Sequence, residues 1–208
     1  APEAFARLGA TVKAIGDAPD GTNINSGCGA TALEALQAAV VEHGFDLGIA
    51  FDGDGDRTMA VDENGKVVDG DEIVAVLALH LGVELVAVTQ MTNYGFHALM
   101  AENNIRVLTT DVGDRYVLEA LWREGGILGG EQSGHIIYLR DHVTGDGLAA
   151  GLLLCGALKG RTLSAAAGVM PRWSQAKENV RVTTKDLPQM VVAEVERRNA
   201  ELAGSGRI

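Results

Sequence analysis

This sequence is poor in cysteine and proline. It contains 2 cysteines and 4 prolines in 208 residues. Two thiols do not make the framework of bridges that holds small secreted domains together, so reduced cysteines are expected. Scarce proline combined with 47% hydrophobic residues argues against a disordered chain and predicts folded domains with a sizeable core.

Basic residues are also few, since 17 Lys and Arg face 28 Asp and Glu and the formal net charge is −11. Such a chain repels nucleic acid and anionic membranes, so neither is an expected partner. A phosphorylated substrate remains compatible, because a metal ion and a few Arg side chains bind phosphate locally. The longest apolar run, residues 147–158, is too short to span a bilayer, and the first residues lack a signal-peptide pattern. A soluble cytoplasmic protein is predicted.

The two ends of the sequence do not look like domain ends. Residues 2–8 have a helical pattern with no capping residue before it, and residues 204–208 look like a turn that enters a strand. We therefore expect the chain to be a piece of a longer protein.

Short apolar runs alternate with helical patterns, and the 27 glycines suit the junctions between them. Strands are predicted at residues 12–15, 47–51, 58–61, 67–68, 85–88, 106–109, 127–128, 136–139 and 177–183. Helices are predicted at residues 31–43, 95–103, 114–123, 146–158 and 187–202. A further helix is predicted to begin at a cap in residues 69–71 and to end at residue 81. Residues 63–65 predict a hairpin turn. The alternation indicates an α/β protein with mixed, mainly parallel sheets.

Three aspartates, Asp52, Asp54 and Asp56, alternate with glycines directly after an apolar strand. Residues two apart in a tight loop can turn their carboxylates toward one point, and the glycines permit the dihedral angles this needs. Three carboxylates so close repel one another unless a cation lies among them. Oxygen ligands favour a hard ion, Mg²⁺ before Mn²⁺ or Ca²⁺. Arg57 would neutralise the carboxylates, hold a phosphate or sugar oxygen, or do both.

Other interpretations of this acidic loop remain open. A solvated acidic turn would not need such symmetry at the end of a buried strand. An EF-hand calcium loop would have its last ligand at Glu63, but Arg57 stands where it requires glycine and the flanks look like strands. A haloacid-dehalogenase phosphatase would use Asp52 as nucleophile, but Asp56 stands where that motif has Thr or Val.

A second polar cluster, Gly-Glu-Gln-Ser-Gly-His at residues 130–135, lies between two apolar strands. It places Glu131, Ser133 and His135 close together. Ser133 lacks the Gly-x-Ser-x-Gly frame of a hydrolase nucleophile. Glu and Ser are better suited to binding vicinal sugar hydroxyls, and a loop braced by its own polar groups is the alternative.

Together the two loops resemble the α-D-phosphohexomutase superfamily. That family has an Asp-Gly-Asp-x-Asp-Arg metal loop in its second domain and a Gly-Glu-x-Ser-Gly-His sugar loop in its third. Gln132, residues 20–29 and residues 112–116 are similar to its phosphoglucosamine mutase branch. The resemblance covers essentially the whole chain. It implies a metal-binding α/β domain at residues 1–68, a sugar-binding α/β domain at 69–170, and the start of an α+β domain at 171–208.

The resemblance also implies residue roles. The Mg²⁺ ligands would be Asp52, Asp54 and Asp56. The substrate would be bound by Arg57, Glu131 and Ser133, with Arg57 and His135 as supporting catalytic groups.

Four further positions are left open. Residues 113–115 face the active cleft in relatives, some of which have His where Asp114 stands. Asp114 is therefore a proton-transfer candidate or a helix N-cap, and the N-cap is favoured. Asn23, Asn25 and Cys28 have no clear chemistry and are expected in an ordered loop beside a domain junction.

The activity implied is interconversion of glucosamine 6-phosphate and glucosamine 1-phosphate through a phosphoserine and a bisphosphorylated sugar, dependent on Mg²⁺. The family's Ser-His-Asn-Pro nucleophile loop and its Arg-x-Ser-Gly-Thr-x-Pro phosphate loop have no counterpart in this sequence. The chain is therefore expected to be inactive alone. A phosphomannomutase/phosphoglucomutase is the alternative within the family, and a phosphatase or a calcium-binding module the alternative outside it. The partner is a phosphorylated amino sugar, and a homodimer is left open.

Overall fold

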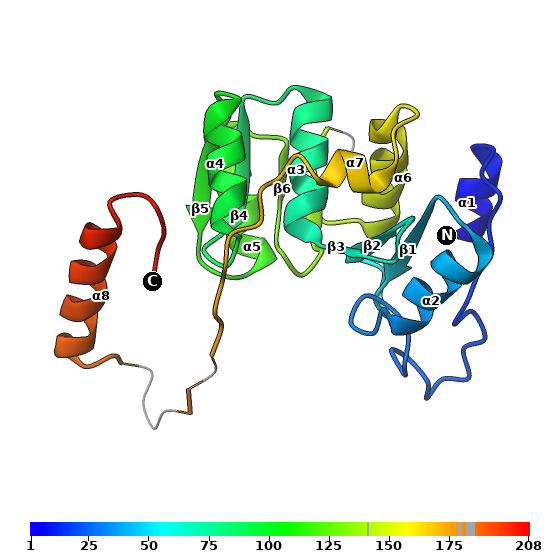
Figure 1. The fold of residues 1–208 in the computed structure, drawn as a ribbon, viewed down its shortest axis with the longest axis horizontal. Coiled ribbons are helices and arrows are strands. Elements are labelled where there is room, and N and C mark those ends of the chain that lie inside the picture. Colours follow the sequence, from blue (N-terminus) through cyan, green and yellow to red (C-terminus); the bar gives the residue numbers. More distant parts are fainter. Residues whose placement is uncertain (141, 179, 182–185) are drawn as a thin grey trace. The chain divides into compact units, whose positions relative to one another are not determined.

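The computed structural model describes residues 1–208 apart from 141, 179 and 182–185. The chain forms two compact units, residues 1–171 and residues 172–208. Figure 1 shows both sheets in the first unit and the helix α8 in the second.

The first sheet of the larger unit is antiparallel, in the order β1-β2-β3. Its strands are β1 (Leu47–Phe51), β2 (Thr58–Asp62) and β3 (Val67–Val68). Asp62 Oδ1 accepts hydrogen bonds from the amides of Asn64 and Lys66, each at 2.9 Å, which closes the turn before β3. The hairpin predicted at residues 63–65 is confirmed.

The helix α2 (Glu34–His43) packs on this sheet at Gly48, where an added Cβ would lie 2.8 Å from the side chains of Leu36 and Val40. It is preceded by α1 (Pro2–Arg7) and by the largely exposed residues 8–29.

The second sheet has the order β5-β4-β6-β7. Its strands are β4 (Leu85–Thr89), β5 (Arg106–Thr110), β6 (Leu128–Gly130) and β7 (Ile136–Tyr138). The strand β4 is parallel to both β5 and β6, whereas β7 returns antiparallel to β6. Every residue of β4 is buried, as expected for a strand covered on both faces.

Helices cover both faces of the second sheet. They are α3 (Gly70–Leu81), α4 (Tyr94–Glu102) and α5 (Asp114–Glu124). The helix α6 (Gly147–Leu158) packs on α3 and on strands of both sheets, and α7 (Leu163–Ala167) packs on α3 and β2. Because successive strand residues point to opposite faces, Val86 and Val88 belong to the core cluster that contains α3, α4 and α6, while Ala87 packs with the buried face of α5. The mixed α/β class is confirmed, and among the described strands the parallel pairs lie in this sheet.

The helix α3 begins at a complete capping box. Asp69 Oδ1 accepts from the Glu72 amide at 3.2 Å, and Glu72 Oε2 accepts from the Asp69 amide at 3.0 Å. Such a pair of bonds satisfies two backbone donors that a helix start leaves open. The predicted cap at residues 69–71 is confirmed, and α3 lies in the centre of the core.

Two expectations on secondary structure differ from the structure. The strand predicted at residues 12–15 is wrong, because this segment pairs with no other described strand and its backbone is irregular. The short helix α7 was not predicted, since its five residues carry too little periodicity. Of the strand predicted at 177–183, residues 179 and 182–183 lie outside the described residues, and residues 177–178 and 180–181 are not in a strand.

In the smaller unit, α8 (Gln189–Leu202) confirms the helix predicted at 187–202. None of its residues is buried, and ion pairs join Glu194 to Arg197 and Arg198 along its surface. Among the helices that the structure describes, none has the length and apolar character needed to cross a membrane.

Candidate metal and sugar site

The two polar loops singled out in the sequence each connect a pair of antiparallel strands, and the fold brings them together. The acidic loop, residues 52–57, joins β1 to β2, and the sugar loop, residues 130–135, joins β6 to β7. The Thr58 amide donates to the Gly134 carbonyl at 2.9 Å, and Arg57 and His135 form an antiparallel bridge. The start of β2 is thus joined to the residues directly before β7.

Gly134 makes this approach possible. Its φ of +92° is one that side-chain-bearing residues rarely adopt, and an added Cβ would overlap the carbonyl oxygen of Thr58. The sugar loop is also fixed to the start of α3, because the Gly70 amide donates to the Gln132 carbonyl at 3.1 Å.

The acidic loop gathers its carboxylates as predicted. Asp52 is buried, Asp56 is half-buried and Asp54 is exposed, and one oxygen of each lies within 4.8 Å of the others. Gly55 has a φ of +77°, and its carbonyl accepts from the Gly147 amide at 3.0 Å. The N-terminus of α6 therefore holds the tip of the loop.

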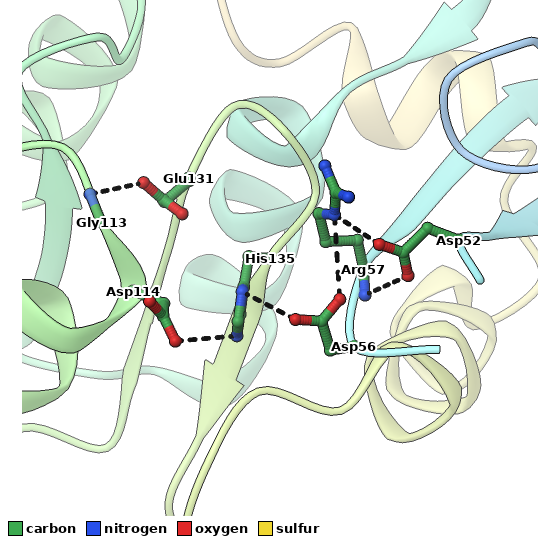
Figure 2. Close-up of polar contacts among 7 residues, drawn as sticks. All are labelled: Asp52, Asp56, Arg57, Gly113, Asp114, Glu131 and His135. Atoms are coloured by element: carbon green, nitrogen blue, oxygen red, sulfur yellow. Dashed lines mark hydrogen bonds and ion pairs between the residues drawn. The ribbon is translucent and has the colours of Figure 1, made fainter. Parts of the chain in front are cut away.

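Arg57 folds back over the aspartates (Figure 2). Its Nε lies 2.5 Å from Asp52 Oδ2 and 3.8 Å from Asp56 Oδ1, and its backbone amide donates to Asp52 Oδ1 at 3.1 Å. Burial works against ionisation of Asp52, but these hydrogen bonds outweigh burial and hold the pKa of Asp52 below its ordinary value.

The carboxyl of Asp56 responds in the opposite way. Burial raises its pKa, His135 lowers it, and repulsion from Asp52 and Asp54 raises it further, so that the net shift is upward. Asp56 Oδ1 is buried and has no hydrogen-bond partner among the described residues. A divalent cation would satisfy this oxygen and remove the repulsion, so the three aspartates fit a hard, oxygen-seeking ion.

The sugar loop is braced by its own backbone and by Glu131. The Glu131 amide donates to the His135 carbonyl and its own carbonyl accepts from Gly134, both at 3.0 Å. Its Oε1 accepts from the Gly113 amide at 3.0 Å, which ties the loop to the start of α5. Ser133 stays exposed at the tip. The bracing predicted as an alternative is present and leaves the Ser133 hydroxyl accessible.

His135 lies between the acidic loop and α5, as Figure 2 shows. Its Nδ1 is 3.4 Å from Asp56 Oδ2, and its Nε2 is 3.9 Å from Asp114 Oδ2. The favoured prediction that Asp114 is a helix N-cap is wrong: Gly113, at φ +134°, occupies that position and Asp114 is the first residue of α5. A glycine directly before an acidic first turn is the sequence signal that could have revealed this.

Two family models match the chain. Residues 1–65 match alpha/beta/alpha domain II, and residues 69–173 match alpha/beta/alpha domain III, of phosphoglucomutase/phosphomannomutase. The chain belongs to the phosphoglucomutase/phosphomannomutase family. The resemblance inferred from the two loops is confirmed.

Within this family, the similar curated proteins include phosphoglucosamine mutases. That of Streptomyces griseus is 52% identical over 221 residues, which cover 100% of this chain and 48% of the relative. That of Moorella thermoacetica is 50% identical over 219 residues, with 100% and 49% covered. The chain is a phosphoglucosamine mutase homologue and spans about half the length of these relatives.

A solved family member has the same fold. The Aspergillus fumigatus N-acetylphosphoglucosamine mutase, crystallised with GlcNAc-6P and magnesium, matches 85% of this chain and 49% of its own, with a TM-score of 0.70 and 18% identity. At that identity the comparison shows the fold alone.

In the present chain, residues 15–29 form a further loop that borders a hollow of about 770 Å³, and this hollow reaches Asp52 and Gly53. Ile24 packs so closely on Gly53 that an added Cβ would lie 2.5 Å from its Cδ1. Asn25 has a φ of +56°. This loop backs the acidic loop, and no role is assigned to Asn23 or Cys28.

Proposed function

We propose that this chain supplies the metal-binding and sugar-binding parts of a phosphoglucosamine mutase. The reaction interconverts glucosamine 6-phosphate and glucosamine 1-phosphate through a phosphoserine and a bisphosphorylated sugar. The observation that carries the proposal is the junction of the two loops, where the Thr58 amide donates to the Gly134 carbonyl at 2.9 Å and His135 Nδ1 lies 3.4 Å from Asp56 Oδ2. Identity near 50% to phosphoglucosamine mutases along the whole chain supports it.

In this proposal Asp52, Asp54 and Asp56 hold Mg²⁺. When bound, the ion offsets negative charge on the phosphoryl group in transfer. The lowered pKa of Asp52 keeps that ligand ionised, because Arg57 stabilises its charged form. Asp56 contributes a buried oxygen for which the described part of the chain offers no hydrogen-bond partner.

In this proposal Arg57 binds a substrate phosphate in addition to its contact with Asp52. Its side chain is 37% exposed and contacts Asp52 through Nε. Figure 2 shows its terminal nitrogens turned away from Asp52 and Asp56. A guanidinium held through one nitrogen still offers donors for an anionic oxygen.

Glu131 and Ser133 are proposed to bind vicinal sugar hydroxyls. A carboxylate has about four acceptor sites, and the Gly113 amide uses one of those on Glu131. The exposed Ser133 hydroxyl both donates and accepts. Because the loop is fixed at Gly70 and Gly134, these groups are oriented before substrate arrives.

The substrate is tested with the full-length protein that carries this chain. In a coupled assay, glucosamine 6-phosphate should give a higher kcat/KM than mannose 6-phosphate or glucose 6-phosphate. A preference for either neutral hexose phosphate would instead support the phosphomannomutase/phosphoglucomutase alternative.

The reaction class is tested on the 208-residue chain itself. No mutase turnover is expected, since the sequence holds no Ser-His-Asn-Pro segment. No phosphate release from a simple phosphate ester is expected either, because Asp52 is held by Arg57. Mutase turnover by this chain would contradict the proposal that the nucleophilic serine lies outside it. Hydrolysis of the phosphate ester would support a phosphatase.

A further inference from the structure

His135 is buried, with 7% of its surface exposed, yet its ring has few partners. Nε2 has no hydrogen-bond partner among the described residues. Two carboxylates flank the imidazole: Asp56 Oδ2 lies 3.4 Å from Nδ1, and Asp114 Oδ2 lies 3.9 Å from Nε2. A buried polar ring usually has a hydrogen-bonded or functional reason to be there.

The position of the ring is fixed from behind by Gly145. A Cβ added to Gly145 would overlap Nε2 and Cδ2 of His135. Gly145 itself is held by an antiparallel bridge to Ile137 in the strand that follows His135. No positive φ requires glycine here, so the imidazole is the reason for the missing side chain.

The contact with Asp56 leaves one oxygen of that carboxylate for another partner. Nδ1 faces Oδ2, while Oδ1 is buried, lies 3.8 Å from Arg57 Nε and makes no hydrogen bond within the described structure. A side chain that holds one oxygen of a carboxylate fixes where the other oxygen points. Partners of this kind behind a ligand typically change metal affinity 10- to 100-fold when removed.

We propose that His135 is a positioning residue that orients Asp56 toward the metal, and that Asp114 and Gly145 hold the imidazole in place. The inference rests on the proposed function, because Asp56 is a ligand only if the acidic loop binds a cation. His135, the last residue of the sugar loop, thereby acts on the acidic loop.

The test measures Mn²⁺ affinity of the 208-residue chain, with free Mn²⁺ counted by electron paramagnetic resonance and Mg²⁺ added as competitor. His135→Ala should weaken binding about 10-fold or more. His135→Asn places an amide nitrogen near the position of Nδ1 and should restore most of the affinity. Asp114→Asn, at an exposed side chain, should weaken binding about 2- to 3-fold.

Two further variants test whether the position of the His135 imidazole matters, and not only its presence. Gly145→Ala keeps the imidazole but displaces it, and should weaken binding about as much as His135→Ala. His142→Ala is the matched control, because His142 Nδ1 also faces a carboxylate, Asp146 Oδ2 at 3.6 Å, and should leave affinity unchanged.

The outcomes separate the two levels of the proposal. If the wild-type chain binds Mn²⁺ and His135→Ala binds equally well, the inference is wrong and the metal site stands. Equal losses in His135→Ala and His135→Asn, with native circular dichroism, would also overturn it. If the wild-type chain shows no saturable Mn²⁺ binding, the metal assignment fails and the inference with it. Should His135→Ala not fold, wild-type affinity in both Gly145→Ala and Asp114→Asn would overturn the inference.

Discussion

The acidic loop and the sugar loop have the same topology but are held by different forces. Both connect antiparallel strands, and both end at the bridge between Arg57 and His135. The sugar loop is fixed by backbone hydrogen bonds at Gly70 and Gly134. The acidic loop gathers three like charges around one guanidinium and leaves a buried oxygen that bonds to no other residue the structure describes. The sugar loop is braced within the protein, whereas the acidic loop keeps a cluster of like charges that a cation would offset.

The largest effect should come from breaking the contact between the loops. Gly134→Ala adds a Cβ that overlaps the Thr58 carbonyl at a φ of +92°. We expect a loss of about 3 kcal/mol in the free energy of unfolding, from overpacking and backbone strain together. Urea unfolding measures it.

Gly156→Ala is the control for that prediction. Gly156 lies inside α6 with no atom within 4 Å of an added Cβ, so alanine there should stabilise the chain by about 0.5–1 kcal/mol. Equal midpoints for Gly134→Ala and Gly156→Ala would show that the two loops do not depend on their close approach.

The second-largest effect should be on Mg²⁺ affinity, which a substitution in the acidic loop should lower and one in the sugar loop should leave unchanged. Asp54→Asn removes one of the proposed ligands and should lower Mg²⁺ affinity at least 10-fold in calorimetry, as expected for loss of a charged oxygen ligand. The same change removes one of the charges that raise the pKa of Asp56. The metal-free chain should therefore be slightly more stable than wild type.

Ser133→Ala in the sugar loop is the matched comparison for Asp54→Asn. Ser133 is also an exposed loop residue but offers no carboxylate, so Mg²⁺ affinity should not change. Unchanged affinity in Asp54→Asn as well would remove the acidic loop from the metal site.

The smallest effect concerns a second junction, at the other end of β2. Glu63, in the turn after β2, accepts hydrogen bonds from the hydroxyl of Ser164 and, at 3.2 Å, from its amide. The Ser164 hydroxyl bond lowers the pKa of Glu63 most, against the opposing effect of burial. A carboxyl whose pKa falls on folding stabilises the protein above its unfolded pKa and loses that contribution as the pH falls through its folded pKa.

Wild type should therefore lose slightly more stability than Glu63→Gln between neutral pH and the acid range below the ordinary Glu pKa. The difference should stay below about 1 kcal/mol, because the group is partly exposed and screened. Parallel pH dependence of the two urea midpoints would show that this junction carries no ionic contribution.

Sequence reasoning worked where a local rule decides the structure. The capping box of Asp69 and Glu72 fixes the start of α3 within four residues, and the turn at 63–65 fixes a hairpin. The acidic loop could be recognised as a candidate metal loop because the alternation of Asp with Gly is a local pattern. These features need no knowledge of what packs against them.

The failures concern partners that are distant in the chain. Residues 12–15 have strand composition, but a strand also needs a neighbour. Asp114 was assigned to a cap because its dihedral angles, and those of Gly113, were unknown. No local pattern connects His135 to Gly145 or to Asp56. The grouping of the two loops was inferred from a family resemblance, and the structure supplies its physical cause at Thr58 and Gly134.

The bridge between Arg57 and His135 has a consequence for biosynthesis. Chains leave the ribosome from the N-terminus, and domains fold as they emerge. The aspartates of the acidic loop are therefore synthesised before His135, which contacts Asp56. They also precede Gly134, which accepts a hydrogen bond from Thr58 at the start of β2. A nascent chain carries the proposed ligands without their final arrangement, so in this proposal Mg²⁺ binding would mark completed tertiary structure.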